Sequence, residues 1–109
     1  VFTVHAFLHS AGKMKDLGAL PGYPYSYGNG LNASGHVVGF VAADEERTTG
    51  EKKRAFLYRD GRMLDLNDAV QPGSAWVLLE ANAINDNGLI VGTGKLNNEL
   101  RSFILTPLR

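Results

Sequence analysis

The residues of this chain that first suggest a metal site are three histidines, His5, His9 and His36. A metal ion holds its ligand atoms about 2 Å away. His5 and His9 lie in a segment with the alternation of a β-strand, and residues four apart in a strand are separated by about 13 Å. His36 lies in a different segment. We therefore expect no metal site at these histidines, and no other motif indicates a cofactor.

Catalysis by paired carboxylates would require two acidic side chains that converge on one cleft. Asp16 and Asp65 are the only acids that recur at matching places, and the repeat pattern predicts a basic residue next to each of them on the adjacent strand. The chain has no cysteine to act as a nucleophile and no Gly-x-Ser-x-Gly elbow. The sequence therefore predicts a protein that is not an enzyme.

Segment 21–27 is the best candidate for ligand binding. If this segment is extended, Tyr23, Tyr25 and Tyr27 lie on one face of it. Tyrosine is amphipathic and loses little entropy on contact, so such a row could stack on a sugar or bind a protein surface. Trp76 is the matching aromatic of the second half of the chain. The alternative is that these four aromatic residues pack between adjacent units of the fold.

Composition narrows the class of protein. The 109 residues correspond to one domain, and a hydrophobic content of 44% is sufficient for a packed core. Eleven basic and eleven acidic residues cancel, whereas nucleic-acid binders carry a basic excess, so we expect no nucleic-acid partner. No apolar run approaches the roughly 20 residues that span a bilayer. Thirteen glycines placed between short apolar runs favour a turn-rich β protein.

An internal repeat with a period of about fifty residues organises the chain. Three blocks recur in the same order, with insertions only between the blocks. The matching blocks are residues 5–8 with 54–57 and 101–104, residues 12–17 with 61–66, and residues 29–39 with 82–92. We place repeat 1 at about 3–50, repeat 2 at about 51–98 and the start of repeat 3 at about 99–109.

Each complete copy is predicted to contain four short strands that form one antiparallel sheet. Alternating apolar residues bounded by glycine and asparagine turns support this assignment, and no helical period competes with it. The expected strands are 3–9, 13–18, 26–32 and 36–42 in the first copy, 53–59, 62–67, 76–85 and 89–95 in the second, and 101–106 in the third.

The first hairpin of each copy places a basic residue near an aspartate. Asp60-Gly61 is a strong two-residue turn signal, and Ala11-Gly12 occupies the matching place. With these turns, Phe7 lies opposite Asp16 with His5 diagonal to Asp16. In the second copy Phe56 lies opposite Asp65, with Arg54 diagonal to it. We interpret His5–Asp16 and Arg54–Asp65 as structural ion pairs that fix the register.

Four-stranded units of about fifty residues are typical of the blades of a β-propeller. Two blades and one strand cannot close a propeller, so the sequence predicts either a homo-oligomer of several chains or a piece of a longer protein. A small β-sandwich made of the two units is the alternative architecture.

The repeated blocks resemble the bacterial HAF repeat family, whose members are regarded as extracellular repeat proteins. The family pattern has a leading His-Ala-Phe-Leu, then Gly-x-Met-x-Asp-Leu, then Ile-Asn-Asp-x-Gly-x-Val-Val-Gly, and its counterparts here run over residues 5–39 and 54–92. Arg54 and Arg101 replace the leading histidine of the family. The resemblance implies export or surface location in bacteria and a propeller-like β fold, and it supplies no catalytic residues.

The sequence thus predicts a non-enzymatic extracellular or cell-surface repeat module with a structural, adhesive or recognition role. Its partner would be an unknown protein or glycan. The alternative function is a carbohydrate-binding propeller assembled from several chains, with sites lined by Tyr23, Tyr25, Tyr27 and Trp76.

Overall fold

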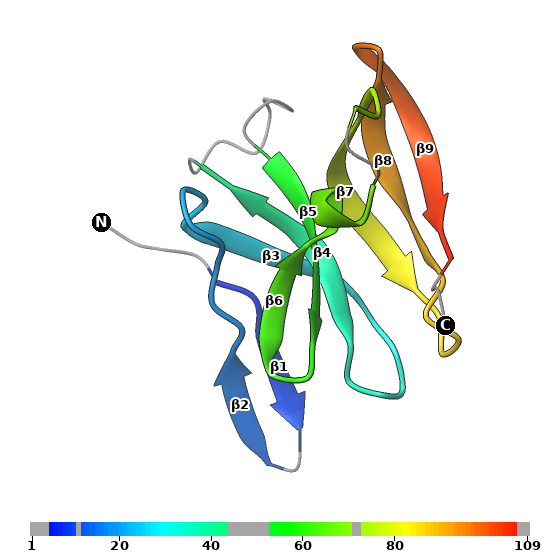
Figure 1. Ribbon diagram of the computed structural model, residues 1–109. Helices are drawn as coiled ribbons and strands as arrows, with labels where there is room; N and C mark the ends of the chain where they lie inside the picture. Colours follow the sequence, from blue (N-terminus) through cyan, green and yellow to red (C-terminus); the bar gives the residue numbers. More distant parts are fainter. Residues whose placement is uncertain (1–4, 11, 44–52, 71–72, 107–109) are drawn as a thin grey trace.

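The computed structural model describes residues 5–10, 12–43, 53–70 and 73–106, and the fold is all-β (Figure 1). The strands are β1 (Phe7–Ser10), β2 (Lys13–Asp16), β3 (Tyr25–Leu31), β4 (Val37–Ala42), β5 (Lys53–Arg59), β6 (Arg62–Asp65), β7 (Trp76–Ile84), β8 (Ile90–Leu96) and β9 (Glu99–Leu105). One 3-10 turn, η2 (Leu66–Ala69), follows β6. All nine expected strands are present, with ends shifted by a few residues. Among the described residues no helix has the length and apolar character needed to span a bilayer.

The strands form three antiparallel sheets. β1 and β2 make a two-stranded hairpin, β3-β4-β5-β6 make a four-stranded sheet in sequence order, and β7-β8-β9 make a three-stranded sheet. None of these sheets closes on itself within the described part of the chain. We call them the hairpin, the central sheet and the C-terminal sheet.

The expectation that each copy of the repeat forms its own sheet is wrong. The central sheet combines the last two strands of the first copy with the first two strands of the second, because β4 pairs with β5 across the repeat boundary. The hairpin holds only the first half of copy one, and β9 of the third copy joins β7 and β8. The sheets are therefore out of phase with the sequence repeat by half a unit. The boundary near residues 50–51, the loop before β5 and residues 3–4 and 107–109 lie outside the described residues.

The segment between β2 and β3 explains why these two strands do not pair. Gly18 and Gly22 have positive φ angles of 81° and 82°, a conformation that favours glycine. Pro21 and Pro24 cannot donate a backbone hydrogen bond to a neighbouring strand. A turn closed by the bond from Tyr23 N–H to the Leu20 carbonyl (2.9 Å) directs the chain away from β2 and into the central sheet.

The register of both first hairpins agrees with the sequence prediction. Phe7 is paired with Asp16, and Phe56 is paired with Asp65. Asp60 and Gly61 both have positive φ, 53° and 79°, as a type I′ turn requires. Gly12 has φ of 77°, while its turn partner Ala11 lies outside the described residues.

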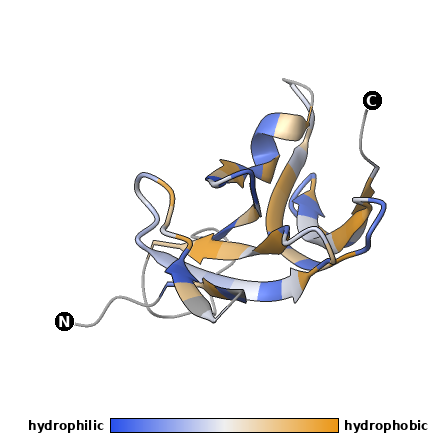
Figure 2. Ribbon diagram, turned by 90° about the horizontal axis from the view of Figure 1, so that it is seen from below, coloured by the Kyte–Doolittle hydropathy of each residue, from blue (hydrophilic) through white to orange (hydrophobic). Residues whose placement is uncertain are grey.

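Two apolar clusters join the three sheets face to face. The N-terminal cluster, between the hairpin and the central sheet, contains Ala6, Leu17, Val37, Val41, Phe56 and Tyr58. The C-terminal cluster, between the central and the C-terminal sheets, contains Val38, Ala55, Leu66, Leu78, Ala81, Ile90 and Phe103. Figure 2 shows hydrophobic residues along the strands in the middle of the molecule. Because neighbouring residues of β4 and β5 point to opposite faces, the central sheet contributes to both clusters.

Candidate functional site

The three tyrosines of segment 21–27 do not form one row. β3 begins at Tyr25, so only Tyr25 and Tyr27 share a strand face. Tyr23 lies in the preceding turn and packs against the N-terminal cluster. The expected single aromatic face is therefore wrong, because the turn that ends at Tyr23 interrupts the extended chain.

Tyr27 lies on the face of the central sheet that is directed toward β7. Its ring stacks on Phe40 with a centroid distance of 4.8 Å and an interplanar angle of 21°. Lys53 Nζ lies 4.7 Å from the centroid of the Phe40 ring and 3.7 Å from Glu80 of β7. This arrangement links the central sheet to the C-terminal sheet through an aromatic pair, a cation–π contact and an ion pair.

Tyr23 and Trp76 occupy equivalent positions in the two copies, because both stand six residues before the matched asparagine blocks that start at Asn29 and Asn82. Tyr23 packs against the N-terminal cluster. Trp76 packs against the C-terminal cluster and makes a T-shaped contact with Phe103, with ring centroids 6.4 Å apart. The two aromatics thus serve the same structural purpose. Each packs against the apolar cluster that lies between two neighbouring sheets.

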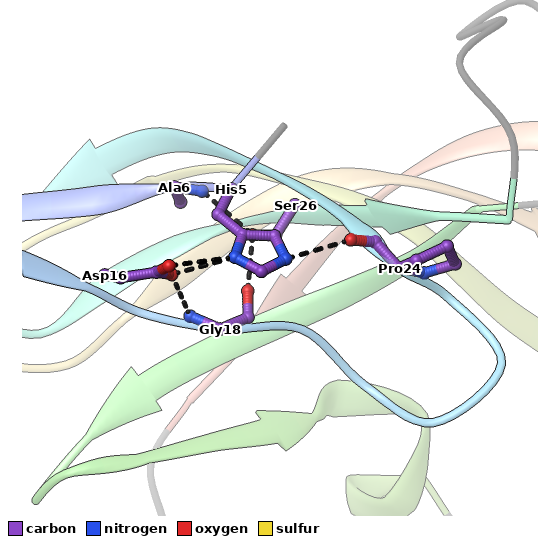
Figure 3. A network of polar contacts seen from close by, with 6 residues as sticks. All are labelled: His5, Ala6, Asp16, Gly18, Pro24 and Ser26. Carbon is purple, nitrogen blue, oxygen red and sulfur yellow. Dashed lines mark hydrogen bonds and ion pairs between the residues drawn. The ribbon is translucent and has the colours of Figure 1, made fainter. Parts of the chain in front are cut away.

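The first junction connects the hairpin to β3 through polar side chains (Figure 3). His5 Nδ1 lies 2.9 Å from Asp16 Oδ1, and His5 Nε2 lies 3.1 Å from the Pro24 carbonyl. Ser26 is fully buried, and its hydroxyl accepts from Ala6 N–H (2.8 Å) while it donates to the Gly18 carbonyl (2.6 Å). One histidine and one serine therefore hold β3 against the hairpin.

Asp16 also stabilises the turn that follows β2. Its Oδ1 accepts a hydrogen bond from Gly18 N–H at 2.8 Å. The hydrogen bonds from His5 and from Gly18 lower the pKa of Asp16 below its ordinary value of 3.8, because they favour the ionised carboxylate. The side chain of Asp16 is two-thirds exposed, so solvent weakens this effect.

The second junction repeats this design with different residues. Arg54 Nε donates to Asp65 Oδ2 at 2.6 Å, and Asp65 Oδ1 accepts from the Asn67 N–H at 2.8 Å. Asn67 bonds both backbone groups of Leu78: its Oδ1 accepts from Leu78 N–H (2.7 Å), and its Nδ2 donates to the Leu78 carbonyl (2.9 Å). Asn67 therefore holds β7 as Ser26 holds β3, although it comes from η2 rather than from the strand itself.

The guanidinium of Arg54 lies between Asp65 and Tyr23. Its Cζ is 5.9 Å from the centroid of the Tyr23 ring. Partial burial alone would lower the pKa of Arg54, but hydrogen bonds to Tyr23 and to Asp65 outweigh burial and raise that pKa. Arg54 is therefore a permanent cation at the centre of the second junction.

A ladder of asparagine turns connects the two copies on another side of the molecule. Asn32 Nδ2 donates to the Asn85 carbonyl (3.1 Å), and Ala33 N–H donates to Asp86 Oδ1 (2.8 Å). Asn29, which lies at a bulge in β3, donates from Nδ2 to the Ala81 carbonyl at 3.0 Å. The turns expected from their glycine and asparagine content therefore also bond sheet to sheet.

A shallow pocket lies beside the second junction. Its volume is about 330 Å³, and it opens between the loop before β3 and the β6–η2 segment. The lining residues are Leu20, Pro21, Tyr23, Arg62, Met63, Leu64, Asp65 and Asp68. Arg62 and Asp68 are exposed, and the remaining lining combines the ring of Tyr23 and the carboxylate of Asp65 with apolar side chains.

The recurring carboxylates are engaged in bonds within the fold. Asp65 accepts from Arg54 and from Asn67, and Asp16 accepts from His5 and Gly18. His36 contacts Asn32 (3.4 Å). Within the part of the chain that the structure describes, no group of three or more His, Cys, Asp and Glu residues could hold a metal ion. The arrangement offers sheet-to-sheet bonding and a small pocket of mixed polarity.

Sequence reasoning missed Ser26, Asn67 and the asparagine ladder. Ser26 and Asn67 stand at positions that do not match in the repeat, so the self-comparison gave no signal for them. Asn29 with Asn82 and Asn32 with Asn85 are identical pairs in the matched blocks. Retention of asparagine, rather than of any turn-forming residue, is the signal that could have identified the ladder.

No family model, curated protein or solved structure matches this chain.

Proposed function

We propose that this chain is a non-enzymatic repeat module of a bacterial extracellular or cell-surface protein, with a structural, adhesive or recognition role. The observation that carries the proposal is how the recurring polar side chains are used. Asp16, Asp65, Asn29 and Asn32 bond strand to strand or sheet to sheet rather than converging on an open cleft. Such an arrangement supports a scaffold whose outer surface makes the functional contacts.

A propeller-like arrangement of blades fits the three sheets better than a small two-layer sandwich. The hairpin and the C-terminal sheet cover opposite faces of the central sheet, so three layers follow one another. Asn29 and Asn32 of the central sheet bond to β7 and its turn, and the C-terminal cluster fills the space between these two sheets. In a propeller, successive blades pack face to face in this manner around an axis.

The extracellular or surface location rests on the resemblance of the repeated blocks to HAF repeats, and it can be tested in cells that produce the protein. An antibody against the folded chain should label intact cells or precipitate the protein from the medium. A cytosolic enzyme of the same cells, which should be labelled only after lysis, is the control. Labelling of this chain only after lysis would contradict the proposed location.

Carbohydrate binding is the second candidate function, and the pocket beside Tyr23 favours it. Sugars bind to aromatic faces flanked by charged hydrogen-bonding groups, and this pocket combines Tyr23 with Arg62 and Asp68. Because Tyr25 and Tyr27 lie on another face, the site is smaller than a row of three tyrosines would provide.

Glycan-array binding by the purified chain tests this second candidate. Arg62→Ala and Asp68→Ala change exposed residues of the pocket, so both variants should keep the melting temperature of the parent and lose at least about tenfold in affinity. Arg59→Ala, an exposed arginine that does not line the pocket, is the matched control. Sugar binding that survives both pocket substitutions would exclude this site.

A further inference from the structure

The three copies of the first repeat block reveal which faces of the molecule are covered and which are open. An aromatic position is occupied by Phe7, Phe56 and Phe103, and the next residue is an aliphatic position occupied by Leu8, Leu57 and Ile104. Neighbouring residues of a strand point to opposite faces of a sheet. The aromatic position therefore faces one neighbouring sheet and the aliphatic position faces the other.

Inside the molecule these two positions meet across both sheet interfaces. Leu8 of the hairpin packs against the cluster that contains Phe56, and Leu57 of the central sheet packs against the cluster that contains Phe103. Phe56 is 0% exposed and Phe103 is 6% exposed. Each aliphatic position is thus covered by the sheet that carries the next aromatic position.

At the two ends of the molecule the same positions are uncovered. Phe7 is 59% exposed, and Ile104 is 67% exposed. Met14, across the hairpin from His9, is 65% exposed, whereas the equivalent Met63 packs against the N-terminal cluster. Large apolar side chains gathered on open sheet faces are typical of interaction surfaces.

The two open faces are complementary in the same way as the covered faces inside the molecule, where an aliphatic position packs against the sheet that carries an aromatic position. The outer face of the C-terminal sheet presents an aliphatic position, and the outer face of the hairpin presents an aromatic position. Figure 1 shows the hairpin and β9 at opposite ends of the row of sheets, so one molecule cannot bring its own two faces together.

We propose that the outer face of the C-terminal sheet, centred on Ile104, binds the outer face of the hairpin, centred on Phe7 and Met14, of a second copy of this chain. The contact is heterologous and head to tail, so it produces a ring if the rotation between copies closes and a linear array if it does not. The inference deepens the proposed repeat module by naming its partner.

Sedimentation velocity of the purified chain over a wide concentration range tests the contact. The average mass should increase with concentration. Ile104→Arg and Phe7→Arg should each weaken association at least about tenfold, because either change places a charge in the apolar contact. Leu31→Arg is the matched control, since Leu31 is 58% exposed on β3 and lies outside both faces. A parent chain that stays monomeric at millimolar concentration overturns the proposal.

A mixture of the two variants distinguishes the head-to-tail contact from a symmetric one. The Ile104→Arg chain keeps its hairpin face, and the Phe7→Arg chain keeps its C-terminal face. Mixed together, they should form a one-to-one dimer that grows no further, although each variant alone is monomeric. A mixture that stays monomeric overturns the assignment.

Circular dichroism establishes whether both variants fold. If either variant does not, Met14→Glu and Leu100→Glu replace the pair, since Leu100 is 68% exposed and shares its face of β9 with Ile104. The cell-labelling experiment is independent of association. A chain that associates but stays inside cells refutes only the location, and a surface chain that stays monomeric refutes only the contact.

Discussion

The two junctions of this molecule have the same plan and different chemistry. In each, an aspartate at the end of a strand accepts from a basic side chain and from the backbone of the following turn. The first junction pairs His5 with an aspartate that is 66% exposed, and the second pairs Arg54 with an aspartate that is 18% exposed. The plan is set by the repeat, and the burial differs between the copies.

This difference indicates what each junction contributes to stability. A buried ion pair must keep both partners, because the loss of one leaves an uncompensated charge, whereas an exposed pair is screened by water. The second junction also anchors a longer strand, since Asn67 bonds both backbone groups of the buried Leu78. We expect the second junction to dominate stability, and the following four predictions test this comparison in order of expected effect.

Asn67→Ala should lower the free energy of unfolding by about 2–4 kcal/mol, because it leaves the N–H and the carbonyl of Leu78 without their partners. Ser26→Ala, the corresponding change at the first junction, should cost about 1–3 kcal/mol. Urea denaturation followed by circular dichroism measures both values. A larger loss for Ser26→Ala would reverse the comparison.

Asp65→Ala should lower the free energy of unfolding by about 1–3 kcal/mol, because the partly buried charge of Arg54 would lose its carboxylate partner. Asp16→Ala should cost less than about 1 kcal/mol, because its pair is exposed. Asp68→Ala, an exposed neighbour in η2, is the control and should melt with the parent. Equal losses of unfolding free energy for Asp65→Ala and Asp16→Ala would show that the difference in burial does not make the second junction more important for stability.

Gly61→Val should cost about 1–2 kcal/mol, because Gly61 has a φ angle of 79° that a β-branched residue resists. The same change at Gly12, with φ of 77°, should cost less, since its hairpin exposes Phe7 and can fray with little loss of buried surface. Thermal melts of the two variants compare the hairpins directly. An unchanged melting temperature for Gly61→Val would exclude the type I′ turn.

The smallest expected effect is the pH dependence of the first junction. Because the folded state lowers the pKa of Asp16 below 3.8, the ionised carboxylate stabilises the fold at neutral pH, and this stabilisation is lost as the pH falls through the folded-state pKa. Asp16→Asn should therefore be slightly less stable than the parent above about pH 5 and converge with it at lower pH.

Melting temperatures measured from pH 7 to pH 2.5 test this convergence. Asp68→Asn, which changes an exposed carboxylate outside the hydrogen bonds of both junctions, is the control. A gap between parent and Asp16→Asn that stays constant at every pH would contradict the role of the ionised carboxylate.

The sequence predicted the local structure of this fold well. Alternating apolar residues and two-residue turns reflect contacts within one hairpin. The sequence could therefore predict the nine strands, the pairing of Phe7 with Asp16 and the pairing of Phe56 with Asp65. The His5–Asp16 and Arg54–Asp65 distances follow from that register, which is why these site residues lie where the pattern places them.

The sequence carries less information on which strands share a sheet and how the sheets pack against one another. A repeat shows that two segments are alike, but it does not show whether β4 pairs with β5 or β2 pairs with β3. That choice depends on the turn between Gly18 and Pro24 and on packing across layers. Ser26 and Asn67 bond across the same layers, and the aromatic row failed because Tyr23 belongs to this turn.

The half-unit offset between repeat and sheet has a consequence for how such a protein lengthens. Inserting one more repeat at a boundary would add one sheet assembled from two adjacent copies, and the existing ends would keep their form. Every added copy would contribute strands to two sheets, one shared with the preceding copy and one shared with the following copy. A fragment of residues 3–50 should therefore hold the hairpin and only two strands of the central sheet, whereas residues 25–65 contain all four strands of that sheet.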